Sequence, residues 1–315
     1  MKKKFIRSGL LLLTLLLLIM YVVKRPSWVT AETLPQAWAV KPEDLQRHVR
    51  FLSEQTNRSH NQPEGLAAAS AYIEAELMAM GLDPQQQAFD VYGQSHHNIV
   101  VRLGPVSPEL IIIGAHYDAY DEMPGADDNA SGVAGLLELA RLLQQHPPSG
   151  AIELVFYTLE EPPHFRTEHM GSYVHAQSLQ QPVQLMISLE MIGYFSKQPG
   201  SQHYPTILMD WLYPDQGNFI AVIDQLWSTQ GQKLKNTFNR YTTLPAFSVN
   251  APSQLPGVDF SDHLNYWALD IPAIMVTDTA FYRNRNYHTA ADTFDTLDYD
   301  KMAQVVLGVF MHVRE

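Results

Sequence analysis

The sequence contains no cysteine in its 315 residues. Disulfide bonds and zinc sites built from thiolates are therefore excluded, and cysteine usage gives no information on the redox compartment. Positive charge is also scarce, because 21 Lys and Arg stand against 33 Asp and Glu and give a formal net charge of −12. Since no basic stripe is available to neutralise phosphates, we expect no nucleic acid partner.

One long apolar run is present, over 9–23 at the N-terminus, and four cations precede it. The positive-inside rule predicts that this end stays in the cytoplasm and that the remainder crosses the membrane. We therefore expect 1–24 to be an uncleaved signal anchor in a bacterial inner membrane, with the folded domain on the periplasmic or extracellular side. The alternative is a signal peptide cleaved near Ala31, which would give a secreted protein. Lys24 and Arg25 directly after the run favour retention.

The rest of the chain is predicted to contain a polar linker over 25–40 and one α/β domain over 41–315. Alternation of strands and helices predicts a single-domain α/β/α sandwich with a mixed, mostly parallel sheet. Residues 196–260, rich in Pro, Gln and aromatics, are interpreted as an insertion of short helices and loops. The periodicity predicts helices over 42–54, 63–80, 131–145 and 298–313, and strands over 98–103, 109–115, 151–159, 183–189 and 272–277.

Histidine and carboxylate side chains follow three of these strands, and two further motifs carry the same residue types. Ligands of open α/β sheets collect at the carboxyl ends of the strands, so these side chains should meet at one edge. Two imidazoles and several carboxylates are the ligands that two zinc ions bind, and one carboxylate remains as a base. A single such residue is usually structural, but five motifs together predict a metallohydrolase. The residues are His116, Asp127, Glu160, Glu161, Glu190 and His288.

The motifs GAHYD (114–118) and PGADDNASG (124–132), followed in order by EE, MIG and YHT, resemble those of a known family. They are similar to the co-catalytic dizinc aminopeptidases of the bacterial leucyl aminopeptidase and aminopeptidase Y type. Their superfamily also includes glutamate carboxypeptidase and the glutaminyl cyclases. The resemblance covers about 42–313 and implies a zinc-exopeptidase fold, two zinc ions per chain, and peptide or protein N-termini as substrates.

The resemblance also implies a role for each ligand. His116 and Glu190 would bind one zinc ion, Glu161 and His288 would bind the other, and Asp127 would bridge both. The position of Glu190 is usually Asp in the best-known members, so an extra methylene must be accommodated here.

By the same resemblance, Glu160 is the general base that takes a proton from the attacking water and delivers it to the leaving amine. Asp118 would orient the imidazole of His116. The peptide bond between the two residues matching 127–128 is cis in the family.

Two further segments are expected near the pocket. The glutamate pair is followed by Pro-Pro-His-Phe (162–165) in place of the usual Gly-containing turn, which affects the rim of the pocket more than the metal chemistry. The segment 260–263 resembles an element beside the family's substrate pocket. Asp262 and His263 are therefore candidate substrate contacts, and the equally open alternative is a helix N-cap.

Three functions remain open at this point. A zinc aminopeptidase is favoured. A glutaminyl cyclase, which is an acyltransferase that uses one zinc ion, is disfavoured because the sequence carries ligands for two. A non-catalytic, receptor-like ectodomain is disfavoured because such relatives lose ligands and this chain keeps them.

Overall fold

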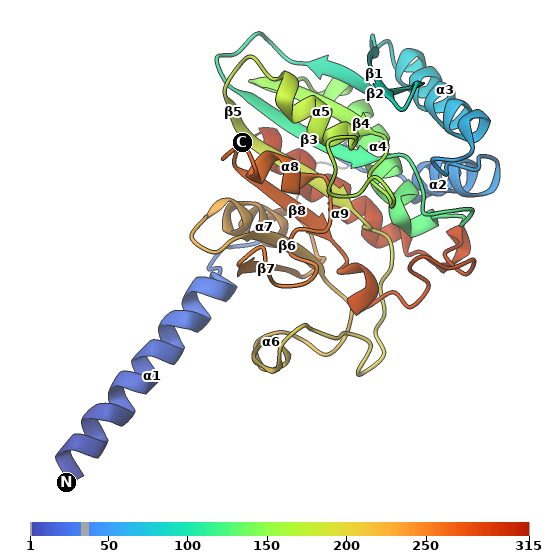
Figure 1. Ribbon diagram of the computed structural model, residues 1–315. Helices are drawn as coiled ribbons and strands as arrows, with labels where there is room; N and C mark the ends of the chain where they lie inside the picture. Colours follow the sequence, from blue (N-terminus) through green and yellow to red (C-terminus); the bar gives the residue numbers. More distant parts are fainter. Residues whose placement is uncertain (1, 33–37, 315) are drawn as a thin grey trace.

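A twisted sheet of eight strands forms the centre of the computed structural model, which describes residues 2–32 and 38–314 (Figure 1). The strand order is β1-β2-β4-β3-β5-β8-β6-β7. The neighbours β4, β3, β5 and β8 run parallel, whereas β2 and β6 pair antiparallel to β4 and β8. The predicted mixed, mostly parallel sheet is therefore confirmed. The strands are β1 (Gln85–Val91), β2 (Gln94–Leu103), β3 (Leu110–His116), β4 (Ala151–Tyr157), β5 (Val183–Glu190), β6 (Ile220–Gln225), β7 (Ala246–Ala251) and β8 (Ala273–Thr277).

Helices cover both faces of this sheet, because the central strands are apolar on both sides. In β3, Ile113 packs into the core on one face, whereas Leu110 and Ile112 pack into the core on the other. The first face is covered by α2 (Pro42–Glu54), α3 (Pro63–Ala79), α4 (Gly132–Gln145), α7 (Gln230–Tyr241) and α9 (Tyr299–Arg314). The second face is covered by α5 (Gly171–Ser178), α6 (Ile207–Leu212) and α8 (His263–Trp267).

The predicted elements are present, and one segment needs correction. The predicted helices and strands lie within a few residues of their expected bounds. The segment 196–260, however, is more than an insertion of short helices and loops, because it contains β6, α7 and β7 and extends the sheet at one edge. The strand β6 was not predicted because its apolar run is short and is flanked by polar residues in the sequence. The edge strand β1 was also missed, since its face is largely exposed and polar.

Within the predicted linker over 25–40, the segment directly after the N-terminal helix α1 (Lys2–Lys24) is docked on the domain. Lys24 Nζ donates a hydrogen bond to the carbonyl of Leu212 at 2.7 Å, and Ser248 Oγ donates to the carbonyl of Lys24 at 3.1 Å. The backbone N–H of Glu32 donates to the carbonyl of Arg240 at 2.7 Å. Residues 33–37 of the expected linker lie outside the described residues.

The helix α1 projects away from the domain beside α7 and β7 (Figure 1). Within the part of the chain that the structure describes, no helix combines the length and apolar character needed to cross a membrane.

Candidate metal centre

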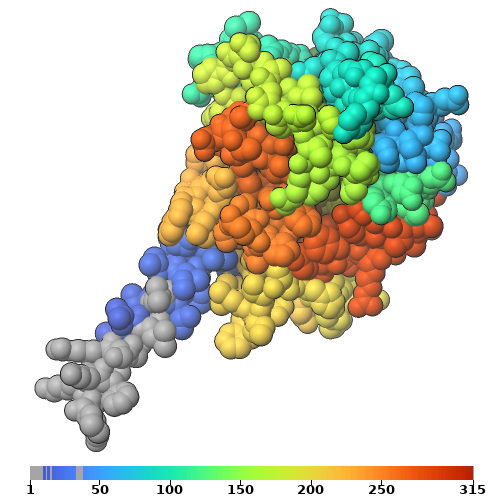
Figure 2. All heavy atoms as spheres, in the orientation of Figure 1, coloured from blue at the N-terminus to red at the C-terminus, as the bar shows by residue number. Residues whose placement is uncertain are grey.

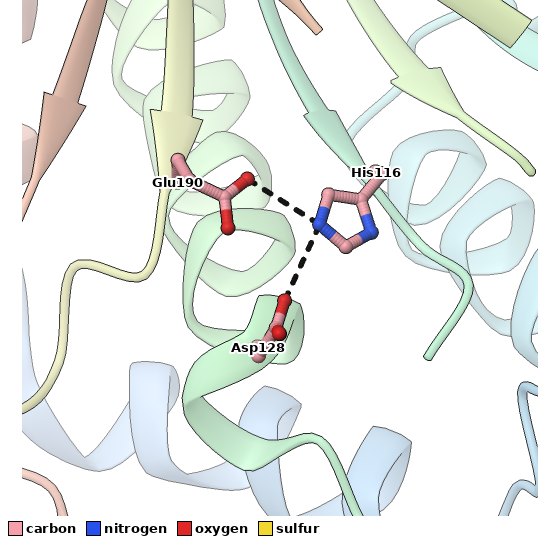
Figure 3. Close-up of side chains that lie close together, drawn as sticks. All are labelled: His116, Asp128 and Glu190. Atoms are coloured by element: carbon pink, nitrogen blue, oxygen red, sulfur yellow. Dashed lines mark ion pairs between the residues drawn. The ribbon is translucent and has the colours of Figure 1, made fainter. Parts of the chain in front are cut away.

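The ends of two neighbouring strands and one turn bring the first group of ligands together (Figure 3). His116 ends β3 and Glu190 ends β5, and the turn Ala126–Ser131 carries Asp128. His116 Nε2 lies 3.3 Å from Glu190 Oε2 and 3.4 Å from Asp128 Oδ1. These three side chains are buried and offer one ligand atom each to a common point.

A second group shares the same aspartate. His288 Nε2 lies 3.0 Å from Asp128 Oδ2 and 3.2 Å from Glu161 Oε2. Asp128 therefore turns one carboxylate oxygen toward each histidine. Two groups of three ligands that share a bridging carboxylate are the arrangement expected for two neighbouring metal ions.

The hydrogen bonding of these atoms fits bound cations. Among the described residues, the Nε2 atoms of His116 and His288 and Oε1 of Glu161 are buried and have no hydrogen-bond partner. Buried polar atoms in proteins are nearly always paired. Here the unpaired nitrogens face carboxylate oxygens at ligand-like separations, so a cation between them would satisfy the whole set. Only oxygen and imidazole nitrogen are offered, a combination that suits zinc.

Asp127 was expected to bridge the two metals, but it is Asp128 whose carboxylate the structure turns toward both histidines. The Asp127 carboxylate accepts hydrogen bonds from the backbone N–H of Gly193 at 3.0 Å and from Asn284 Nδ2 at 2.8 Å. It therefore faces away from both histidines. The cis peptide bond likewise lies between Asp128 and Asn129, not between Asp127 and Asp128.

The expected role of Asp118 is wider than the orientation of one ring. Its Oδ1 lies 3.4 Å from His116 Nδ1. Its two oxygens also accept hydrogen bonds from the backbone N–H groups of Glu160 at 3.1 Å and Glu161 at 3.0 Å. One buried carboxylate thus sets the position of a ligand histidine and of the glutamate pair.

Glu160 is close to the ligands but belongs to neither group. Its Oε2 lies 3.8 Å from His116 Nε2, and the side chain is buried. Burial raises the pKa of the Glu160 carboxyl well above its usual range in the metal-free protein, and the charges of Glu190 and Glu161 add to this. A carboxylate that lies beside the two ligand groups but belongs to neither is available to accept a proton.

Left-handed backbone conformations place several of these residues. Leu159, directly before the glutamate pair, has φ 58°, Met191 after Glu190 has φ 50°, and His288 itself has φ 56°. Non-glycine residues rarely adopt positive φ, and such residues gather at functional sites.

Ser261 and Asp292 support the ligands and were not among the predicted site residues. Ser261 Oγ donates a hydrogen bond to Glu190 Oε2 at 2.8 Å and lies 2.8 Å from Ser188 Oγ. Asp292 accepts hydrogen bonds from the backbone N–H groups of Asp127 at 2.9 Å and Asp128 at 3.1 Å. Asp292 follows His288 by four positions in the chain, and this proximity is the signal that could have indicated its role.

Arg58 connects the loops that surround the candidate metal centre. Its guanidinium is buried and donates hydrogen bonds to the carbonyls of Tyr117 at 2.9 Å and Gly125 at 2.7 Å. It also contacts the carbonyl of Leu52. Burial lowers the pKa of Arg58 to about 10, so it remains charged at neutral pH among the site's carboxylates.

The candidate substrate contacts Asp262 and His263 are both buried. His263 Nε2 pairs with the carbonyl of Val258 at 2.9 Å and its ring packs on Trp267, so it has a structural role. Burial raises the pKa of Asp262 to about 7, and nearby carboxylates, among them Glu190, add to this. Neither residue lines the cavity described next.

A small apolar cavity of about 70 Å³ opens beside Glu190. Its wall comes mainly from the segment 202–223, from the segment 255–260 and from the residues that follow β8. The lining includes Met209, Tyr213, Phe219, Ile223, Val249, Val258, Phe260, Met275, Phe281 and Tyr282.

Comparison with known proteins agrees with this geometry. The sequence profile of Peptidase family M28 matches residues 98–312. Uncharacterized protein YfbL of Escherichia coli is 48% identical over 97% of both chains, and probable aminopeptidase YDR415C of Saccharomyces cerevisiae is 28% identical over 79% of this chain and 65% of that protein.

Solved structures show the same fold. The Legionella pneumophila LapA aminopeptidase superposes with a TM-score of 0.66 at 21% identity, over 87% of this chain and 70% of that one. A glutaminyl cyclase of Bacteroides thetaiotaomicron superposes with a TM-score of 0.64 at 20% identity, over 87% of this chain and 98% of that one. At this level of identity the similarity shows the fold alone.

Proposed function

Because the chain belongs to peptidase family M28, we propose that it is a zinc-dependent aminopeptidase that removes the first residue of peptides or proteins. The observation that carries the proposal is the sharing of Asp128 by two groups of ligands with Glu160 beside them. His116 and Glu190 would hold one zinc ion and Glu161 and His288 the other.

The chemistry of the residues follows from this placement. Two zinc ions in these positions supply Lewis acidity for the scissile carbonyl and for a water molecule. Glu160 accepts the proton of the attacking water and passes it to the leaving amine. Asp118 keeps the backbone of Glu160 and Glu161 in place during this transfer.

The charges around the cavity favour an N-terminal residue over a C-terminal one. No Lys or Arg is found among the residues that line the described cavity, whereas Glu190 is one of them. A carboxypeptidase needs a cation for the substrate's α-carboxylate. An α-ammonium group is instead attracted by the carboxylates of this site, and the apolar wall suits the side chain of the same residue.

The test is the metal content and product of the full chain purified in mild detergent. We expect two zinc ions per chain and release of the first residue from aminoacyl substrates such as leucine p-nitroanilide, lost on chelation and restored by zinc. Activity that persists after exhaustive metal removal would contradict the proposal. One zinc ion per chain together with cyclisation of N-terminal glutamine would identify a glutaminyl cyclase, and a metal-free, inactive chain would indicate a receptor-like domain.

We further propose that α1 holds this domain at the periplasmic or extracellular side of a bacterial inner membrane. The cationic flank and the apolar run support this orientation. Recovery of a soluble product that begins at Glu32 would instead indicate cleavage after Ala31 and secretion.

A further inference from the structure

We propose that the surface around the end of α1 contacts a lipid bilayer. The domain itself would then touch the membrane and would not be joined to it only through a flexible linker. This surface, called here the tryptophan face, consists of the exposed side chains of Trp28, Ile207, Leu208, Trp211 and Trp227. The inference is independent of the enzymatic function proposed above.

The exposure of these tryptophans is unusual. Trp28 and Trp211 are each 84% exposed and Trp227 is 76% exposed. The chain has five tryptophans, and the other two, Trp38 and Trp267, pack against the core clusters. Single exposed apolar residues need no explanation, but three tryptophans on one surface mark an interaction site.

Three separate segments bring these residues together around the end of α1. The amine of Lys24 contacts the carbonyl of Leu212, the neighbour of Trp211 in α6. Gln232 Nε2 donates a hydrogen bond to the carbonyl of Pro26 at 3.1 Å, which ties the first turn of α7 to the segment before Trp28. Trp227 lies in the turn that precedes the same helix. In Figure 2 the blue end of α1 is flanked by the yellow segment that contains α6 and by the golden segment that leads into α7.

The apolar surface of α1 indicates that a lipid bilayer is what covers the tryptophan face. Leu10, Leu11 and Leu17 on this helix are 63%, 74% and 56% exposed, and Tyr21 in its last part is also exposed. The helix leaves the domain beside β7 (Figure 1). Trp28 is four positions after Lys24, so it stays within about 14 Å of the helix end. Tryptophan prefers the boundary between hydrocarbon and water, which is where the end of an inserted apolar helix lies.

The contact must depend on the aromatic rings more than on charge. The chain carries a net charge of −12, which gives no general attraction to anionic lipid. We therefore expect the tryptophan face to bind neutral and anionic bilayers about equally.

The short helix α6 links this face to the cavity. Ile207 and Trp211 point outward, whereas Met209 and Leu212 are buried, and Met209 lines the cavity beside Glu190. Lipid would therefore contact one side of the helix whose other side forms the wall of the cavity.

Quenching of tryptophan fluorescence by brominated lipid tests the proposal. The full chain is reconstituted in phosphatidylcholine vesicles with or without lipid brominated in the acyl chains. The triple variant Trp28→Phe, Trp211→Phe and Trp227→Phe keeps the two packed tryptophans and serves as the reference. We expect quenching of the parent chain to exceed that of the triple variant at least about two-fold, because the three exposed indoles dominate the quenchable emission.

Two reporters in the triple variant complete the experiment. Tyr21→Trp reports insertion of α1 and should be quenched. Tyr92→Trp is the matched control, because Tyr92 is 84% exposed and follows β1, at the edge of the sheet opposite to β7. It should not be quenched.

Each other outcome contradicts the proposal. Quenching of the Tyr21→Trp reporter without quenching of the native tryptophans would show that α1 inserts while the domain stays clear of the bilayer. Absence of quenching in every protein would show that no part of the chain enters lipid. A lipid-independent blue shift that grows with protein concentration would assign the tryptophan face to a second copy of the chain, and a requirement for phosphatidylglycerol would replace the aromatic contact by an electrostatic one.

Discussion

The ring of Tyr120 stacks on the imidazole of His288, with the centroids 3.9 Å apart and the planes inclined by only 2°. Tyr287 stacks on the other side at 3.7 Å, so the imidazole is held between two phenol rings. Burial lowers the pKa of His288, but the adjacent carboxylates of Asp128 and Glu161 outweigh this effect and raise it to about 10 in the metal-free protein. A metal ion must therefore displace a proton from His288.

Removal of the stacking ring should weaken metal binding at this position. In Tyr120→Ala the imidazole loses one of its two supports, and we expect the zinc affinity of the His288 site to fall about 10-fold, the scale seen for residues that orient metal ligands. Tyr120→Phe keeps the ring and should bind zinc like the parent. Titration against a chromophoric zinc chelator measures both variants, and equal affinity of the Ala variant and the parent would contradict the role.

The two adjacent aspartates should differ sharply in their effect on metal content. Asp128→Asn removes one ligand from each group, so we expect the purified protein to hold less than one zinc ion per chain. Asp127→Asn keeps the bridging carboxylate and should retain both ions, although it weakens the contacts to Gly193 and Asn284. Metal analysis of the two variants decides the matter, and retention of zinc by Asp128→Asn alone would restore the bridging role to Asp127.

Substitutions of the two glutamates should affect catalysis and metal binding separately. Glu160→Gln removes the base and leaves the ligands, so kcat should fall at least about 10²-fold with two zinc ions retained. Glu161→Gln should lose zinc from the His288 site. If Glu160→Gln loses zinc and Glu161→Gln keeps it, the two roles are exchanged.

The sequence predicted the ligands at strand ends better than the residues that support them. His116, Glu161 and Glu190 lie where short apolar strands end, and the period of the strands fixes that position. The choice between Asp127 and Asp128 depends on which of two adjacent side chains the backbone turns inward, and residue types alone do not encode this. Tyr120, Ser261 and Asp292 reach the site through tertiary packing of distant loops. The strands β6 and β7 were missed because their apolar runs are short and the intervening helix is strongly polar.

The stability of the metal-free protein should decrease as the pH rises from about 4 to 7. Burial, with the charge of Asp127 in addition, raises the pKa of Asp292 from 3.8 to about 7. The folded state therefore holds this proton more tightly than the unfolded state, and the resulting stabilisation is complete below about pH 4 and lost as the pH rises toward 7. Thermal unfolding in the presence of a chelator measures the slope.

Two comparisons test the origin of that slope. Residue 292 cannot titrate in Asp292→Asn, so this variant should show a shallower slope than the parent. Zinc should reverse it, because zinc binds deprotonated ligands and its stabilising effect grows with pH. A chelated Asp292→Asn protein with the same slope as the parent would show that other groups, and not Asp292, cause the pH dependence.

A chain that begins at Glu32 should be less stable than the full chain. Lys235 is buried and donates hydrogen bonds to the carbonyls of Lys24 and Arg25. Removal of residues 1–31 leaves this amine without its two acceptors, and we expect a loss of about 1–3 kcal/mol in the free energy of unfolding. Denaturant unfolding of both chains measures the difference. Lys235→Met in the shortened chain should recover part of the loss, and no recovery would show that other contacts of the segment are responsible.

The docking of residues 23–32 also imposes an order on biosynthesis. The partners of Lys24 in this contact are Leu212 and Ser248, which are 188 and 224 residues further along the chain. At the usual rate of translation the ribosome needs roughly 10 to 45 s to supply them. During this interval the N-terminal helix has already left the ribosome while its docking surface does not yet exist. A targeting factor or a protease therefore meets this segment in an extended, accessible form, and the same peptide bonds become protected once β7 has joined the sheet.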